Sequence, residues 1–164
     1  MGAILLTVET TSAEGTSISP YIIPILTLNA EPNVVSLGEE FTLRGKLSIS
    51  RESGDINQDG IVDIRDISIV GRAYGSYPGH PKWNPDADLN GDGIVDIRDI
   101  AIVARNFAQT AAAKPIEIQQ LIGDSWVKIA DLTTSNDGSF ELTLSAPEVT
   151  GTLYFRAYFP GGEY

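Results

Sequence analysis

The chain has 164 residues and a formal net charge of -11, from 22 Asp and Glu against 11 Lys and Arg. This length allows one ordinary domain or two small ones, and 42% hydrophobic residues are enough to build a core. Because an acidic surface repels phosphate backbones and anionic lipid, the composition argues against nucleic-acid and membrane-surface binding and favours cations as partners. The absence of cysteine excludes disulfides, thiolate metal ligands and cysteine nucleophiles.

The N-terminal part of the chain predicts β-strands. Residues 22–28 and 40–50 are rich in β-branched and aromatic residues, and apolar side chains recur at even spacing in the second of these segments. Residues 33–38 read as a turn-bearing link between the two strands. A further candidate strand, residues 3–9, is too short and too poor in flanking basic residues to be an intact signal peptide.

The middle of the chain contains an internal repeat. Residues 55–75 align without gaps onto residues 88–108 at an offset of 33, and 14 of the 21 positions are identical. Each copy begins with the pattern D-x-N-x-D-G-x-x-D-x-x-D, which differs from an EF-hand loop by Asp at the twelfth position. The repeat therefore predicts two cation-binding loops.

Both loops supply oxygen donors at the spacing that wraps six to eight of them around one Ca²⁺ ion. The predicted ligands of the first loop are Asp55, Asn57, Asp59, the backbone carbonyl of Ile61, Asp63 and Asp66, and those of the second are Asp88, Asn90, Asp92, the carbonyl of Ile94, Asp96 and Asp99. Gly60 and Gly93 occupy the sixth position, where the loop turns sharply. Mg²⁺ fits less well, because it retains water and accepts fewer protein ligands.

Folding of this segment is expected to depend on calcium. Four carboxylates in each loop repel one another, and two Ca²⁺ ions would change the formal charge from -11 to -7. The alternative is a pair of acidic Asp-Gly turns that bind no ion. Two loops in register favour calcium over that alternative.

A short helix is predicted after each loop, over residues 64–74 and 97–107, from apolar residues at helical spacing. No helix is predicted before either loop, because residues 51–54 are too few and residues 76–86 contain three prolines. Loop followed by helix, without an incoming helix, resembles the type I dockerin repeat. The resemblance implies calcium binding at the residues named above and a protein partner of the cohesin class.

The resemblance also implies that the tenth and eleventh loop positions contact the cohesin. In this chain they are Ile64-Arg65 and Ile97-Arg98 rather than the small hydroxylated residues of many dockerins. Most dockerins also lie at a chain terminus. A purely structural, calcium-clamped insert is therefore a second interpretation of this segment.

The C-terminal part again predicts short strands, with alternating apolar residues between turns at residues 123–124, 136–138, 147 and 160–162. Together with residues 36–50, it resembles the immunoglobulin-like β-sandwich repeats of bacterial and archaeal surface proteins. In such repeats a short hairpin joins the strands that here end near Ser50 and begin near Pro115. We therefore predict a mainly β fold, with a discontinuous sandwich over residues 1–50 and 115–164 and an inserted calcium-binding domain over residues 51–114.

Sandwich repeats of this type continue after the Gly-Gly-x-Tyr turn with a final strand, whereas this sequence stops at Tyr164. A sheet that lacks its last strand exposes an unpaired edge. Residues 1–10 could supply the missing strand within the chain, or could be donated to another subunit. The sequence allows both arrangements.

No catalytic site is predicted, because no paired carboxylates, Ser-His-Asp set, P-loop or dinucleotide motif appears. The preferred hypothesis is a non-enzymatic, extracellular calcium-binding protein that assembles with copies of itself into a surface layer or filament. The alternative is a dockerin-type adaptor that binds a cohesin-like receptor in a cell-surface or polysaccharide-degrading complex. Millimolar extracellular calcium would keep weak sites occupied, which favours the cell surface as location. A carbohydrate-binding sandwich is a third hypothesis.

Overall fold

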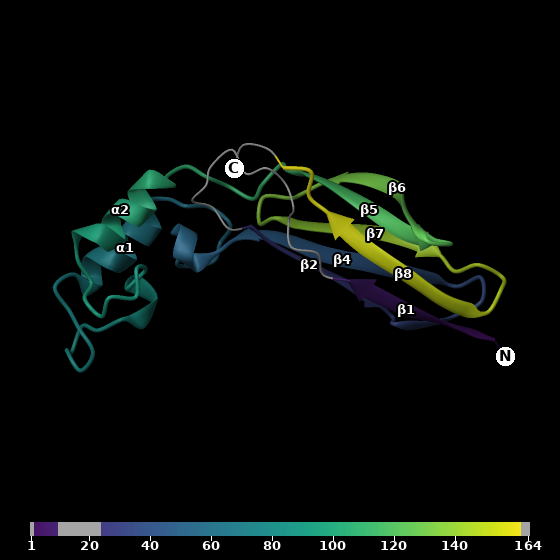
Figure 1. Cartoon of the computed structure of the whole chain (residues 1–164), viewed down its shortest axis with the longest axis horizontal. Coiled ribbons are helices and arrows are strands. Elements are labelled where there is room, and N and C mark those ends of the chain that lie inside the picture. The colour runs from purple at the N-terminus through teal and green to yellow at the C-terminus, as the bar shows by residue number, and fades with distance from the viewer. Residues whose placement is uncertain (1, 10–23, 162–164) are drawn as a thin grey trace.

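The computed structural model describes residues 2–9 and 24–161. Strands from the two ends of the chain form two sheets, and the middle of the chain forms a helical end beside them (Figure 1). The molecule is elongated, with the helices at one end and the sheets extending away from them.

The larger sheet has five strands in the order β3-β1-β8-β5-β6. These strands are β1 (Ala3–Glu9), β3 (Val34–Ser36), β5 (Pro115–Ile122), β6 (Ser125–Thr133) and β8 (Gly151–Tyr158). All neighbours are antiparallel except β1 and β8, which run parallel from the pair Ile4–Gly151 to the pair Glu9–Arg156. Strand β8, close to the C-terminus, therefore lies inside the sheet.

The smaller sheet contains β2 (Pro24–Glu31), β4 (Glu40–Ile49) and β7 (Ser139–Ser145), in the order β2-β4-β7. Alternation along each strand sends one set of side chains inward. The inward set forms the core between the sheets, and its largest fully buried members are Ile4, Phe41, Leu43, Leu47, Ile116, Ile118, Phe155 and Phe159. The two sheets thus form a sandwich.

The helical end contains α1 (Ile64–Ala73) and α2 (Ile97–Arg105), with short 3-10 helices η1 (Arg51–Ser53) and η2 (Pro85–Ala87). A second apolar cluster lies between them, and includes the fully buried Val62, Val70, Val95 and Val103. Trp83 packs against this cluster with part of its ring exposed. The Asn106 side chain donates a hydrogen bond to the Ser53 carbonyl at 2.6 Å, which joins the end of α2 to η1.

Both predicted helices are confirmed and end one or two residues earlier than predicted. The short strands predicted for the C-terminal part are also present, as β5, β6, β7 and β8. Residues 33–38 are more than a link, because residues 34–36 form β3 on β1. This prediction was wrong since three residues are too few to show a strand pattern. Residues 1, 10–23 and 162–164, which include the first two residues of the predicted strand at 22–28, lie outside the described part of the chain.

Strand β1 pairs within its own chain, with β3 on one side and β8 on the other. The edge of β8 that the sequence led us to expect as unpaired is therefore covered by β1. The structure selects the cis arrangement from the two that the sequence allowed.

Candidate metal centre

The first acidic loop, residues 55–66, is closed by its own carboxylates. Asp55 accepts hydrogen bonds from the amides of Asp59 and Gly60 at 3.2 and 3.0 Å. Asp66, eleven positions later, accepts from the Ile56 amide at 2.8 Å. Both acids are fully buried, so the two ends of the loop are brought together around a polar centre.

The second loop, residues 88–99, repeats this arrangement. Asp88 accepts from the Gly93 amide at 2.9 Å, and the buried Asp99 accepts from the Leu89 amide at 2.9 Å. The other carboxylate oxygen of Asp88 is buried and has no hydrogen-bond partner. A buried carboxylate oxygen without a donor is costly, and a cation would compensate it.

The ninth and twelfth loop positions also start the helices. Asp63 is the N-cap of α1 and forms a capping box with Asp66, and Asp96 and Asp99 do the same for α2. A carboxylate at this end of a helix accepts from free backbone amides and interacts favourably with the helix dipole. Loop closure and helix initiation therefore depend on the same side chains.

Arginine side chains at the eleventh position fold back onto the loops. Arg65 lies 2.6 Å from an Asp59 oxygen, and Arg98 makes the same contact with Asp92 at 2.6 Å. The dockerin resemblance placed these arginines at cohesin-contacting positions and did not predict their contact with the loop. The sequence pattern did not predict this contact either. Each arginine follows the fifth-position acid by six residues, and the two side chains meet only because the loop turns back on itself.

The surroundings of Asp55 in the first loop shift the pKa of its carboxyl group. The pKa of the Asp55 carboxyl is raised to about 6, chiefly by burial. The Gly60 amide opposes this rise by donating a hydrogen bond, whereas the Asp66 carboxylate adds to it. The charged form of Asp55 is therefore disfavoured in the first loop as long as no cation compensates it.

Each loop carries its predicted ligands in the predicted order, but their oxygen atoms do not surround a common point. Across residues 2–9 and 24–161, no three acidic or histidine side chains are placed to hold an ion. Their oxygens instead accept from backbone amides and from the two arginines. The donors suit Ca²⁺, a hard cation that prefers oxygen ligands, and the partnerless Asp88 oxygen fits such a site. Binding requires some carboxylates to exchange these partners for the ion.

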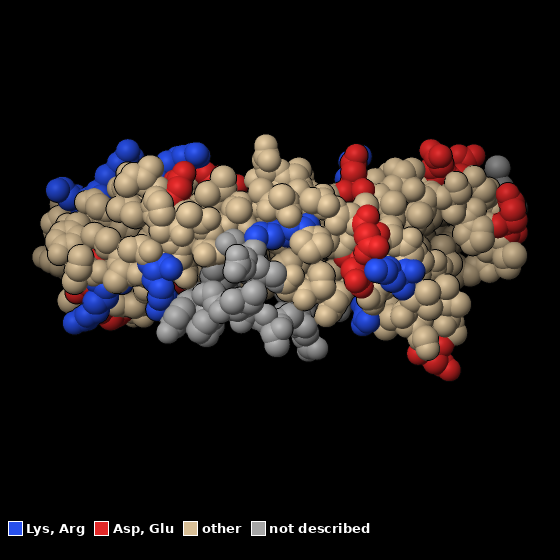
Figure 2. Space-filling view, turned by 90° about the horizontal axis from the view of Figure 1, so that it is seen from above, with Lys and Arg blue, Asp and Glu red and all other residues tan. Residues whose placement is uncertain are grey.

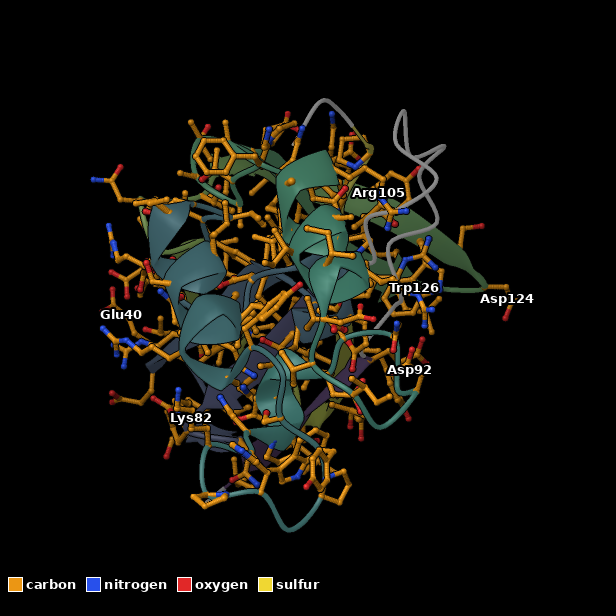
Figure 3. The ribbon with its side chains drawn as sticks, turned by 90° about the vertical axis from the view of Figure 1, so that its left-hand side faces the viewer. Glu40, Lys82, Asp92, Arg105, Asp124 and Trp126 are labelled. Carbon is orange, nitrogen blue, oxygen red and sulfur yellow. The ribbon has the colours of Figure 1, made fainter. Side chains whose placement is uncertain are left out.

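Each loop is also fastened to the opposite helix. Val62 exchanges backbone hydrogen bonds with Ala108 and Gln109, just after α2, and Val95 exchanges them with Gly75 and Ser76, just after α1. These backbone hydrogen bonds therefore join the two loop-helix repeats, which share the core of buried valines. Figure 3 looks onto this end of the molecule, with the two helices side by side and Asp92 at the periphery.

The dockerin type I family model matches residues 53–108, which contain both loops and both helices. This segment is a dockerin type I domain within a β-rich chain. Dockerin type I domains typically bind Ca²⁺, are non-catalytic modules and belong to extracellular cellulosome proteins. No curated protein matches the chain.

Two solved structures resemble the chain weakly. They are an N-terminal and a C-terminal interface mutant of a type II cohesin–X-dockerin complex from Acetivibrio cellulolyticus. The first is 13% identical, with a TM-score of 0.35 over 67% of this chain and 97% of that one. The second is 14% identical, with a TM-score of 0.35 over 66% and 95%. Likeness at this level carries no argument about fold or partner.

In the described part of the chain, no helix is long and apolar enough to cross a membrane.

Proposed function

We propose that this chain is a non-catalytic docking module whose dockerin domain binds calcium and attaches the chain to a cohesin-like receptor. The observation that carries this proposal is a surface that occurs twice. Ile64 and Ile97, at the start of the two helices, are each 61% exposed although both are large apolar residues. A single exposed apolar side chain is ordinary, but the same exposure at the equivalent place of both repeats supports a binding surface that occurs twice.

The surroundings of the two isoleucines are also equivalent. Each is followed by an arginine that a loop carboxylate holds at 2.6 Å, and a half-exposed aromatic residue, Tyr74 or Phe107, follows the opposite end of each helix. An apolar centre with an ordered arginine is the composition that protein interfaces favour. We define these two sets as the docking surfaces: Ile64, Arg65 and Tyr74, and Ile97, Arg98 and Phe107.

Charge distinguishes the docking end from the rest of the molecule. On the face shown in Figure 2, Lys and Arg gather over the helical end, whereas Asp and Glu gather over the far part of the sandwich. The chain as a whole is acidic. A receptor that presents an apolar patch bordered by carboxylates would therefore approach the helical end in preference to the sandwich.

We further propose that calcium is held by the twelve predicted ligands, six in each loop. These are Asp55, Asn57, Asp59, the Ile61 carbonyl, Asp63 and Asp66, and Asp88, Asn90, Asp92, the Ile94 carbonyl, Asp96 and Asp99. The ion would neutralise the loop carboxylates and hold the helix starts in place. Because Ile64 and Ile97 are the first helical residues, calcium binding and docking are linked.

The proposed architecture is a discontinuous immunoglobulin-like sandwich, residues 1–50 and 115–164, that carries the docking domain as an insert over residues 51–114. Supporting it, the chain leaves the sandwich after β4 and returns at β5, and both connections lie at the end that faces the helices (Figure 1). An extracellular or cell-surface location follows for the proposed docking role, and millimolar calcium there would keep the loops occupied.

The self-assembly hypothesis has less support than docking. Strand donation required residues 1–10 to be available to a neighbour, but β1 occupies a place in its own sheet. The dockerin match also favours a receptor of another class over a second copy of the chain.

Binding to a panel of purified cohesin modules, measured by biolayer interferometry in millimolar calcium, tests the proposed function. The double variant Ile64→Asp/Ile97→Asp should weaken binding by about thirtyfold or more, as expected for central interface residues. Either single variant should lose less, because one docking surface remains. Aspartate is well accepted at the first turn of a helix, so the fold should be retained, and circular dichroism checks this.

Val149→Asp is the matched control, because Val149 is 73% exposed but belongs to the sandwich. This variant should bind like the parent chain. Equal affinity of the double variant and the parent, or no binding to any cohesin, would overturn the proposed function.

A further inference from the structure

The two calcium loops have the same acidic donors but different neighbours. A Cβ atom built on Gly60, in the first loop, would lie 3.5 Å from the Asp137 carbonyl oxygen, which belongs to the sandwich. One built on Gly93, the equivalent residue of the second loop, would meet nothing within 4 Å. The first loop rests on the sandwich, and the equivalent part of the second loop faces open space.

A line of hydrogen bonds connects the first loop to the sandwich. The Gly60 carbonyl accepts from the Ala111 amide at 2.9 Å, and the Ala111 carbonyl accepts from the Thr134 hydroxyl at 2.6 Å. The same hydroxyl accepts from the Lys114 amide at 2.8 Å, just before β5. Ala111 is fully buried and belongs to the sandwich core, and Thr134 follows β6. We refer to Gly60, Ala111 and Thr134 as the relay.

The turn against which Gly60 lies is itself fixed. Gly138, in this turn, is buried and accepts a hydrogen bond from the Leu47 amide of β4 at 2.9 Å. Asp137 accepts hydrogen bonds from the Ser135 and Ser139 hydroxyls, which hold the pKa of its carboxyl far below the usual range. The first loop therefore meets a rigid part of the sandwich.

The equivalent residue of the second loop has no such bond. Among the described residues, the Gly93 carbonyl accepts no backbone hydrogen bond from the sandwich, whereas the Gly60 carbonyl accepts one from Ala111. Asp88 is half-buried, whereas Asp55 is fully buried. Two sites with the same ligand pattern are thus placed in unequal surroundings.

We propose that the first loop is a calcium-dependent joint that fixes the dockerin domain to the sandwich, and that the second loop orders the dockerin domain alone. The inference rests on calcium binding in the proposed function. Its physical basis is that the Ile61 carbonyl, a predicted ligand, adjoins Gly60, and that Ile61 pairs with Thr110 next to Ala111. Ordering this backbone orders the relay.

The coupling is reciprocal. If the bound ion stabilises the relay, the relay in turn holds the first loop near its binding conformation and raises its calcium affinity. The chain should therefore bind two ions in two steps, with the first loop as the tighter site. The ligand pattern does not predict this difference, since both loops carry the same acidic and asparagine donors and differ only at Ile56/Leu89 and Gln58/Gly91.

Calcium titration by calorimetry tests the order of the two sites with a matched pair of variants. Asp59→Asn and Asp92→Asn change the fifth position of each loop and remove the same arginine contact. We expect Asp59→Asn to weaken mainly the tighter step and Asp92→Asn mainly the weaker one, because asparagine keeps an oxygen ligand but loses its charge. The reverse order, or two equal steps in the parent chain, would overturn the inference.

Thr134→Val tests the relay without altering a ligand. It removes the buried hydroxyl and keeps the shape of the side chain, and should weaken the tighter step by about fivefold or more while leaving the weaker step unchanged. Thr133→Val, at an exposed neighbouring position, is the control and should change neither step. A Thr134→Val chain with both steps unchanged, or with both steps weakened equally, would overturn the relay.

Hydrogen exchange gives a readout that does not depend on affinity. Calcium should slow amide exchange in residues 108–113 and 135–139 of the parent chain and of Asp92→Asn, but not of Asp59→Asn. Equal protection in both variants would overturn the joint while leaving the proposed calcium-dependent docking intact. A chain that bound no calcium would instead overturn the proposed function itself.

Discussion

Gly138 and Gly123 have similar backbone conformations, but the atoms that surround them differ. Both have positive φ, +81° and +63°. A Cβ on Gly138 would lie 2.0 Å from the Leu47 carbonyl oxygen, whereas one on Gly123 would meet nothing within 4 Å. Gly138 is required because its neighbours leave no room for a side chain at the turn that meets the calcium loop. Gly123 is favoured only because its hairpin turn has a positive φ.

Alanine substitutions at these two positions should therefore have unequal costs. Gly123→Ala carries only the left-handed backbone penalty, about 1–2 kcal/mol. Gly138→Ala adds a clash with main-chain atoms that cannot move aside, and should lower the free energy of unfolding by about 4 kcal/mol or more. Urea denaturation of both variants in calcium measures the difference, and equal costs would contradict the packing described here.

Among the strands, β1 has a different role from the one it had in the self-assembly hypothesis. The side chains of its first four residues alternate, with Ile4 and Leu6 at 0% and 5% exposure and Leu5 between them at 48%. Its backbone pairs on both sides, with β3 and with β8. These features make β1 an integral part of the sandwich.

Substitutions along β1 test this role. Ile4→Ala and Leu6→Ala should each lower the free energy of unfolding by about 2–5 kcal/mol, because they leave a cavity between the sheets. Leu5→Ala, on the exposed face of the same strand, should cost less than about 1 kcal/mol. Thermal or urea unfolding of the three variants gives the comparison. If all three were as stable as the parent chain, β1 would not be part of the folded sandwich.

At the scale of the whole molecule, the sandwich and the dockerin domain have separate apolar cores. The sandwich core is built from strands with few charges inside, whereas the dockerin domain is small and encloses the buried acids Asp55, Asp66 and Asp99. The two parts should therefore respond differently to removal of calcium.

We expect EDTA to reduce the helical circular-dichroism signal while the strand signal remains, and millimolar calcium to restore the helices. Light scattering should report a monomer of about 18 kDa in both conditions, since β1 is not free to be donated. Growth to large particles only in calcium would contradict this and would revive the self-assembly hypothesis.

The two loops, the two helices and most of the strands could be predicted from the sequence alone. These features depend on local patterns: acids at fixed spacing, Gly60 and Gly93 at the sharp turns, and apolar residues at helical or alternating spacing. The dockerin resemblance is confirmed by the family match, and the assignment of the twelve calcium ligands stays a prediction. Local chemistry was sufficient because each loop closes within twelve residues.

Only the tertiary structure decided where β1 pairs, that residues 34–36 form a strand, and how the two loops differ. A parallel pair such as β1 with β8 joins residues nearly 150 positions apart, and no local pattern encodes such a partner. In the same way, the contacts that single out the first loop come from Ala111 and Thr134, far from it in sequence. Two loops with the same acidic donors become unequal here through the residues that pack against them.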